Sequence, residues 1–191
     1  QPGPDITASD WEGLRTLYAR RAPLFLRSAL DGWEGEFRWV PHHVAHAASA
    51  AFASGFDPCS VLVLDGRGER ASHLAGRFAG GSLEVLAAQA LPHSLGLLYE
   101  ELTAHLGFRR SSDEYKVMAM ASYGEPAFLD EFRSLVYALD GGFRVEPIDL
   151  SRFAPALGSG EPFTPAHAAL ACSVQRRLEE VLLELAAWLH A

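Results

Sequence analysis

The chain has 191 residues and a formal net charge of −8, from 24 acidic and 16 basic side chains. Proteins that grip a nucleic-acid backbone usually carry the opposite charge bias, so this composition argues against nucleic-acid binding. With 49% apolar residues the chain can bury a sizeable core, as one large domain or as two small lobes. The two cysteines, Cys59 and Cys172, lie far apart, which disfavours a disulfide scaffold and a thiolate zinc site.

No apolar run is long enough to cross a bilayer, and the first residues do not resemble a signal peptide. The sequence therefore predicts a soluble, cytoplasmic protein without a membrane partner. The chain begins with Gln and ends within a helical pattern, so we interpret it as an internal piece of a longer protein.

The first predicted elements are a helix, a short strand and a second helix. The first helix begins at a capping box, Ser9 to Glu12, and ends near residues 31–33. Residues 36–41 read as a strand. An alanine-rich helix follows from His42, with Gly55 as its expected end.

A three-stranded meander is predicted for the middle of the chain. Residues 60–69 form an apolar, β-branched run that breaks into a glycine turn, which is typical of a buried strand. Two further strands are expected over 70–80 and 82–92, around a Gly-Gly-Ser turn.

Mostly helices are predicted after the meander. They cover residues 94–108, 113–124 and 126–139, and a short strand is expected over 143–147. The last helix opens with a Thr164 cap and with Pro165 in its first turn. The predicted class is mixed α/β.

The second helix opens on a histidine cluster, in the sequence HHVAHAASAAF. His42 and His46 are four residues apart, so they share one helix face with Cβ atoms roughly 5–6 Å apart, and both imidazoles can converge on one ion. The alternative is a polar, solvated helix end, because the chain holds eight histidines and some pairs arise by chance. Spacing alone leaves both interpretations open.

The predicted strand tip, DGRGE, carries a second group of polar residues. Asp65 at this tip can complete a set of two histidines and one carboxylate. Glu69 and the amides of Gly66 and Gly68 can face a phosphate or a carbamoyl group. The alternative is an ordinary β-turn, since Asp-Gly is a favoured hairpin dipeptide.

A third candidate is Lys116, which lies amid apolar residues beside Asp113 and Glu114. A lysine in this position can reach a phosphate. It can equally be a solvated side chain on an amphipathic segment.

Five segments taken together resemble the O-carbamoyltransferases of the NodU/CmcH type, which act in nodulation-factor and antibiotic biosynthesis. They occur in the order of that family, at residues 42–52, 61–72, 94–108, 113–124 and 167–182. The resemblance implies an actin- and sugar-kinase-like (ribonuclease-H-like) α/β fold that is incomplete at both ends. Residues 1–58 would belong to the first lobe and residues 59–191 would begin the second.

The resemblance also implies roles for individual residues. His42, His46 and Asp65 would hold a divalent metal (iron, zinc or manganese), with one more aspartate beyond the chain. His43 lies about 100° around the helix from its neighbours, so it would contact the substrate or support the site from outside. Catalytic roles are predicted for His43, Glu69 and Lys116, and cofactor-binding roles for Gly66 and Gly68.

The implied reaction uses ATP and carbamoyl phosphate to make a carbamoyladenylate, and then passes the carbamoyl group to a hydroxyl of a small secondary metabolite. The family makes the adenylate in a YrdC-like domain, which is absent here and is expected in the rest of the parent chain. The opening GxxxHDxSA-like segment and the glycine-rich nucleotide segment are also missing, so the fragment alone is expected to be inactive. Two alternatives stay open: a nucleotide-hydrolysing or kinase-like protein of the same fold, and a non-catalytic lobe that binds a metal or a partner.

Overall fold

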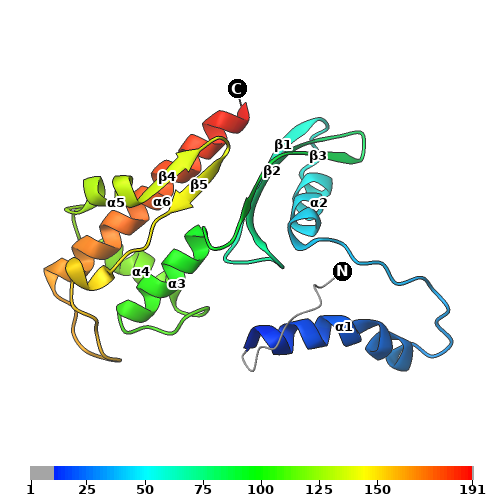
Figure 1. The fold of residues 1–191 in the computed structure, drawn as a ribbon, viewed down its shortest axis with the longest axis horizontal. Helices are drawn as coiled ribbons and strands as arrows, with labels where there is room; N and C mark the ends of the chain where they lie inside the picture. Colours follow the sequence, from blue (N-terminus) through cyan, green and yellow to red (C-terminus); the bar gives the residue numbers. More distant parts are fainter. Residues whose placement is uncertain (1–10, 191) are drawn as a thin grey trace. The chain divides into compact units, whose positions relative to one another are not determined.

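The computed structural model describes residues 11–190, and the chain divides into two compact units, Gln1–Pro41 and His42–Ala191. In the first unit, helix α1 (Trp11–Ala29) is followed by a stretch without regular structure (Figure 1). Ser9 of the predicted capping box lies outside the described residues. The prediction of a strand over residues 36–41 is wrong. Phe37 and Trp39 pack edge to face on each other at 4.9 Å, and no described strand pairs with this segment, so the alternation of side chains alone does not make a strand.

Helix α2 (His42–Ser54) opens the second unit and confirms the predicted alanine-rich helix. It ends at Gly55, whose φ of +74° is a left-handed conformation that glycine adopts without strain. Its buried face is the stripe His43, Ala47 and Ala51, with one residue every four positions. His42 and His46 lie on the neighbouring, more exposed face.

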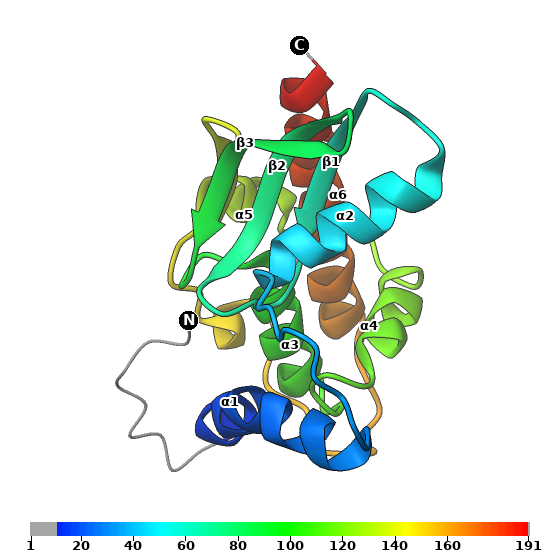
Figure 2. The same cartoon turned by 90° about the vertical axis from the view of Figure 1, so that its right-hand side faces the viewer.

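The predicted meander is confirmed as an antiparallel sheet in the order β1-β2-β3, formed by β1 (Cys59–Leu64), β2 (Ala71–Ala79) and β3 (Ser82–Ala90). Positive φ angles at Gly80 and Gly81 provide the tight turn between β2 and β3. Helix α2 crosses one face of this sheet (Figure 2). Between them lies a small core, which we call the α2–sheet core. Its buried members are Ala47, Ala51, Val61, Val63, Leu74 and Phe78.

The rest of the unit is mainly helical, with one hairpin. It contains α3 (Leu95–His105), α4 (Glu114–Ala121), α5 (Leu129–Leu135), β4 (Val136–Leu139), β5 (Gly142–Val145), the 3₁₀ helix η1 (Leu150–Arg152) and α6 (Pro165–His190). These elements enclose the larger core, which we call the helical core; its fully buried side chains include Leu102, Phe132, Leu170 and Val181. None of the described helices is long and apolar enough to cross a membrane.

The helix predicted over residues 126–139 is only half right. It stops at Leu135, and Val136–Leu139 forms strand β4 against β5. Asp140 and Gly141 both have positive φ, the conformation of a two-residue hairpin turn, so cross-strand pairing replaces the last helical turn.

His73 connects the sheet to this hairpin. Its ring is fully buried, with Nδ1 3.1 Å from the carbonyl oxygen of Val63 and Nε2 2.8 Å from that of Gly141. The side chain therefore joins β1, β2 and the β4–β5 turn.

Candidate functional site

The first turn of α2 and the tip of β1 bring the predicted ligand residues together. His42 Nε2 lies 2.5 Å from Asp65 Oδ2, and His46 Nε2 lies 3.0 Å from His42 Nε2 and 3.6 Å from Asp65 Oδ2. Helix α2 carries His42 and His46 on one face. Strand β1 ends at Leu64, so the carboxylate of the next residue, Asp65, lies beside both imidazoles. We call His42, His43, His46 and Asp65 the histidine–aspartate cluster.

His43 also belongs to this cluster, although it lies on a different face of the helix. It is only 5% exposed, and its Nε2 lies 3.9 Å from Asp65 Oδ2. The reason is that α2 packs its buried stripe onto β1, so a residue in the first turn of that stripe points at the strand tip. Among the described residues, His43 Nε2 is a buried side-chain nitrogen without a hydrogen-bond partner. A buried polar atom of this kind is costly unless a ligand satisfies it.

The surroundings favour the deprotonated forms of two members. Burial lowers the pKa of His43, and the neighbouring His42 lowers it further, so the neutral imidazole is favoured. Partial burial raises the pKa of the Asp65 carboxyl, but hydrogen bonds from His42 and the Gly66 amide outweigh it, and the net pKa lies below the ordinary value. A neutral imidazole and an ionised carboxylate are the forms that bind metal ions.

The glycines of the DGRGE loop bring its backbone close to the cluster. The Gly66 amide donates to Asp65 Oδ1 at 2.6 Å, and the Gly68 amide donates to the carbonyl of Ala71 at 2.8 Å. A Cβ at Gly68 would lie 3.3 Å from atoms of His42 and His43, so a side chain here would press on the histidines. Both amides are thus engaged within the loop, and their predicted role in cofactor binding stays a prediction.

Glu69 contacts the helix rather than the imidazole rings. Its carboxylate oxygens accept from the backbone amide of His42 at 3.1 and 3.3 Å, and the side chain is exposed. The loop therefore meets His42 at both its ring and its backbone.

Ser94 and Gly96, at the start of α3, contact the DGRGE loop at Gly66. Neither residue was predicted from the sequence to belong to the site. Ser94, the N-cap of α3, donates to the carbonyl of Gly66 at 2.6 Å and accepts from the amide of Leu97. Gly96 packs directly against the loop, because a Cβ there would meet Gly66 Cα at 2.6 Å. A serine before an apolar helical run is a recognisable cap signal, but nothing in the pattern says which loop it faces.

Lys116 lies on α4 and contacts Asp113, Phe108 and Tyr115 rather than the histidine–aspartate cluster. Its ammonium lies 3.1 Å from Asp113 Oδ2 and 5.7 Å from the ring centroids of Phe108 and Tyr115. These contacts suit a half-buried cation on an amphipathic helix. The predicted contact with a phosphate stays a prediction.

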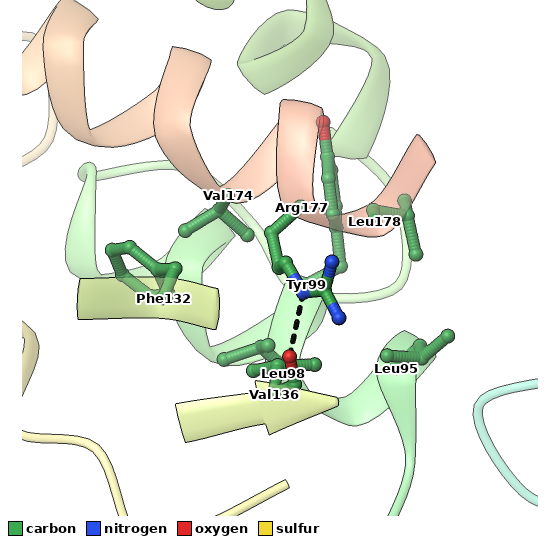
Figure 3. A pocket seen from close by; sticks show the side chains of 8 residues that line it. All are labelled: Leu95, Leu98, Tyr99, Phe132, Val136, Val174, Arg177 and Leu178. Carbon is green, nitrogen blue, oxygen red and sulfur yellow. Dashed lines mark hydrogen bonds between the residues drawn. The ribbon is translucent and has the colours of Figure 1, made fainter. Parts of the chain in front are cut away.

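The pocket in Figure 3 is part of the helical core. It holds about 10 Å³, room for roughly one water molecule, between Leu95, Phe132 and Val174. Arg177 lines it and donates from Nε to the carbonyl of Val136 at 2.6 Å (dashed line in Figure 3). This pocket is too small for a metabolite. The histidine–aspartate cluster is the candidate site because its own side chains converge.

The sequence is similar to one protein family and to several bacterial proteins. Residues 33–190 match the family described as carbamoyltransferase N-terminus. The chain is 39% identical over 156 residues to nodulation protein NolNO of Sinorhizobium fredii, covering 77% of this chain and 22% of that protein. It is 37% identical over 150 residues to nodulation protein NolO of Bradyrhizobium diazoefficiens, covering 74% and 27%, and 37% identical over 161 residues to the uncharacterized protein sll1178 of Synechocystis, covering 75% and 26%. The chain thus spans about a quarter of the length of these relatives.

Proposed function

The chain belongs to the carbamoyltransferase family through the N-terminal domain of that family, and from this premise we propose that it carries the metal site of an O-carbamoyltransferase. In this proposal His42, His46 and Asp65 bind a divalent ion, which is iron, zinc or manganese. The observation that carries the proposal is the convergence of two imidazole nitrogens on one carboxylate oxygen.

The donor set fits such an ion. Ligand atoms about 2.1 Å from one ion lie roughly 3–4 Å apart, as His46 Nε2 lies from His42 Nε2 (3.0 Å) and from Asp65 Oδ2 (3.6 Å). The shorter contact of 2.5 Å between His42 and Asp65 is a hydrogen bond, which an ion would replace. The unpartnered nitrogen of His43 adds to the polar lining.

The chemistry follows from this lining. A bound divalent ion supplies Lewis acidity, which polarises the carbonyl of a carbamoyl group. Asp65 contributes negative charge that balances the ion, while His42 and His46 fix its place at the start of α2. Transfer to a hydroxyl also needs a group that takes up the proton. His43 is a candidate for that role, because its Nε2 faces the cluster and burial lowers the pKa of its imidazole, which favours the neutral form.

For the whole protein, we propose that ATP, carbamoyl phosphate and water give a carbamoyladenylate, pyrophosphate and phosphate in another domain. A small-molecule hydroxyl then accepts the carbamoyl group here, and AMP leaves. In this proposal the described domain is part of a two-lobed, actin-like arrangement completed by the rest of the parent chain. The support is the family membership and the order of the five matching segments.

The metal site is tested by elemental analysis after reconstitution with iron, zinc or manganese. We expect about one equivalent in the wild type and strong loss in His46→Ala, because one of the nitrogen ligands is removed. The control is His190→Ala, which removes an exposed histidine in the last turn of α6. Equal metal content in all three proteins would contradict the proposed site.

The reaction is tested on the longer parent protein. We expect carbamoylation of a hydroxyl acceptor from carbamoyl phosphate and ATP, and loss of this activity in His46→Ala but not in His190→Ala. Hydrolysis of ATP that does not depend on carbamoyl phosphate would favour the nucleotide-hydrolysing alternative.

A further inference from the structure

The structure assigns to Glu69 a positioning role: we propose that its carboxylate caps helix α2 and thereby holds His42 against Asp65. This inference rests on the proposed metal site and adds a residue that supports it without binding the ion. The contact is direct, since the carboxylate oxygens lie 3.1 and 3.3 Å from the backbone nitrogen of His42.

Helix α2 needs such a partner. The first amides of a helix have no carbonyl partner within the helix, and a side chain at the preceding position usually accepts one of their hydrogen bonds. That position is Pro41, which has no hydrogen-bonding side chain. Glu69, 27 residues further along, provides the acceptor, and its negative charge also suits the positive end of the helix dipole.

The cap and the cluster meet in one residue. The backbone of His42 donates to Glu69, while the ring of His42 contacts Asp65, four positions before Glu69 in the same loop. Gly68 lets the loop backbone approach His42 closely, because it has no side chain. A Cβ at this position would lie 3.3 Å from the Cβ and Cδ2 of His42. The loop therefore contacts both the backbone and the ring of His42. Without the backbone contact, we expect the first turn of α2, which carries the imidazole, to fray.

The geometry favours capping over ligation for Glu69. Both of its oxygens face an amide, whereas Asp65 faces the imidazole nitrogens. Capping needs an acceptor, and the charge adds only a weaker attraction to the helix dipole, so glutamine should retain most of the cap and alanine should not. This difference separates capping from a role that depends on a negative charge at the metal.

The experiment compares the wild type, Glu69→Ala, Glu69→Gln and the control Glu101→Ala, which removes an exposed glutamate on α3. Cobalt(II) is titrated while its visible absorption is followed. We expect the cobalt dissociation constant to rise about tenfold in Glu69→Ala, the scale seen when a group that orients a metal ligand is lost. In Glu69→Gln it should rise less than about threefold, because the amide oxygen still accepts a hydrogen bond. It should not change in the control.

Amide hydrogen exchange of residues 42–45 in the metal-free proteins gives an independent measurement. We expect roughly fivefold faster exchange in Glu69→Ala only, since loss of a cap frays the first turn. Unchanged exchange in Glu69→Ala, or a Glu69→Gln variant as weak in cobalt binding as Glu69→Ala, would overturn the proposal. Faster exchange with unaltered cobalt binding would overturn the positioning role. If the wild type binds no cobalt, the proposed metal site fails, and the exchange data alone decide whether Glu69 caps α2.

Discussion

Gly96 lies at the second position of α3, where its Cα packs against the backbone of the loop that carries Asp65. A Cβ there would meet Gly66 Cα at 2.6 Å and Gly66 N at 2.7 Å, and these backbone atoms cannot rotate away. We expect Gly96→Ala to lower the free energy of unfolding by about 1–3 kcal/mol, the usual range for overpacking. It should also weaken metal binding, because the loop must shift. Urea unfolding and metal titration check both effects.

The matched control is Gly66→Ala, on the other side of the same contact. Its Cβ would lie 3.4 Å from Glu100 Oε1, an ordinary contact, so its stability should change by less than about 1 kcal/mol. If the two variants are equally stable, close packing against Gly66 is not the reason that position 96 needs glycine.

Sequence patterns predicted part of the cluster at the scale of single residues. The spacing of His42 and His46 and the place of Asp65 at a strand end depend only on local geometry, and the three side chains do converge. The burial of His43 depends on which helix face packs on the sheet, and the contact of Glu69 depends on where a distant loop lies. Neither is encoded in a local pattern.

Helices α5 and α6 are joined by an ion-pair network centred on Glu180. Its carboxylate accepts two hydrogen bonds from Arg133, at 2.5 and 3.0 Å, and one from Arg177 at 2.7 Å. The hydrogen bonds from Arg133 contribute most to lowering the pKa of Glu180 to about 2 from its ordinary 4.5, and Arg177 contributes further. Because the pKa is lower in the folded state, the stabilisation is complete above pH 4.5 and is lost as the pH falls toward 2.

We therefore expect Glu180→Gln to lower the free energy of unfolding by about 1 kcal/mol at pH 7, allowing for solvent screening of a partly exposed group. The difference from wild type should shrink at pH 3, where the wild-type carboxyl loses this advantage. Urea unfolding at both pH values measures it, with the exposed Glu131→Gln as the control. A difference that does not change with pH would rule out the charge as its cause.

Most element types followed from the sequence, and the two failures have one cause. Residues 36–41 have a strand-like alternation but no neighbouring strand among the described elements, whereas Val136–Leu139 has a helical context but gains β5 as a partner. A strand needs a second segment for its hydrogen bonds, so the outcome is decided outside the strand itself.

Within the second unit, the α2–sheet core lies directly under the histidine–aspartate cluster, whereas the helical core packs α3 to α6 together. Leu74 lies in the α2–sheet core and Leu102 in the helical core, with exposed fractions of 5% and 0%. Either change to alanine should cost about 2–5 kcal/mol of unfolding free energy. Only Leu74→Ala should also weaken metal binding, because only that core presses α2 onto β1. Thermal unfolding and metal titration of both variants test this division, and equal metal affinities would refute it.

Family membership also belongs to this scale. No single motif was specific, but five segments in a fixed order pointed to the carbamoyltransferases, and residues 33–190 match that family.

The loop contact between Glu69 and His42 spans 27 residues of chain, whereas the His73 contact with Gly141 spans 68. In polymer terms, closing a loop costs entropy that grows with the logarithm of its length, so the shorter loop is the easier one to close. Bringing the histidines and Asp65 together therefore costs less chain entropy than closing the longer connection that His73 bridges. The site thus joins segments that are close in the sequence, and the helical framework that follows them in the chain supports the Asp65 loop through Ser94 and Gly96.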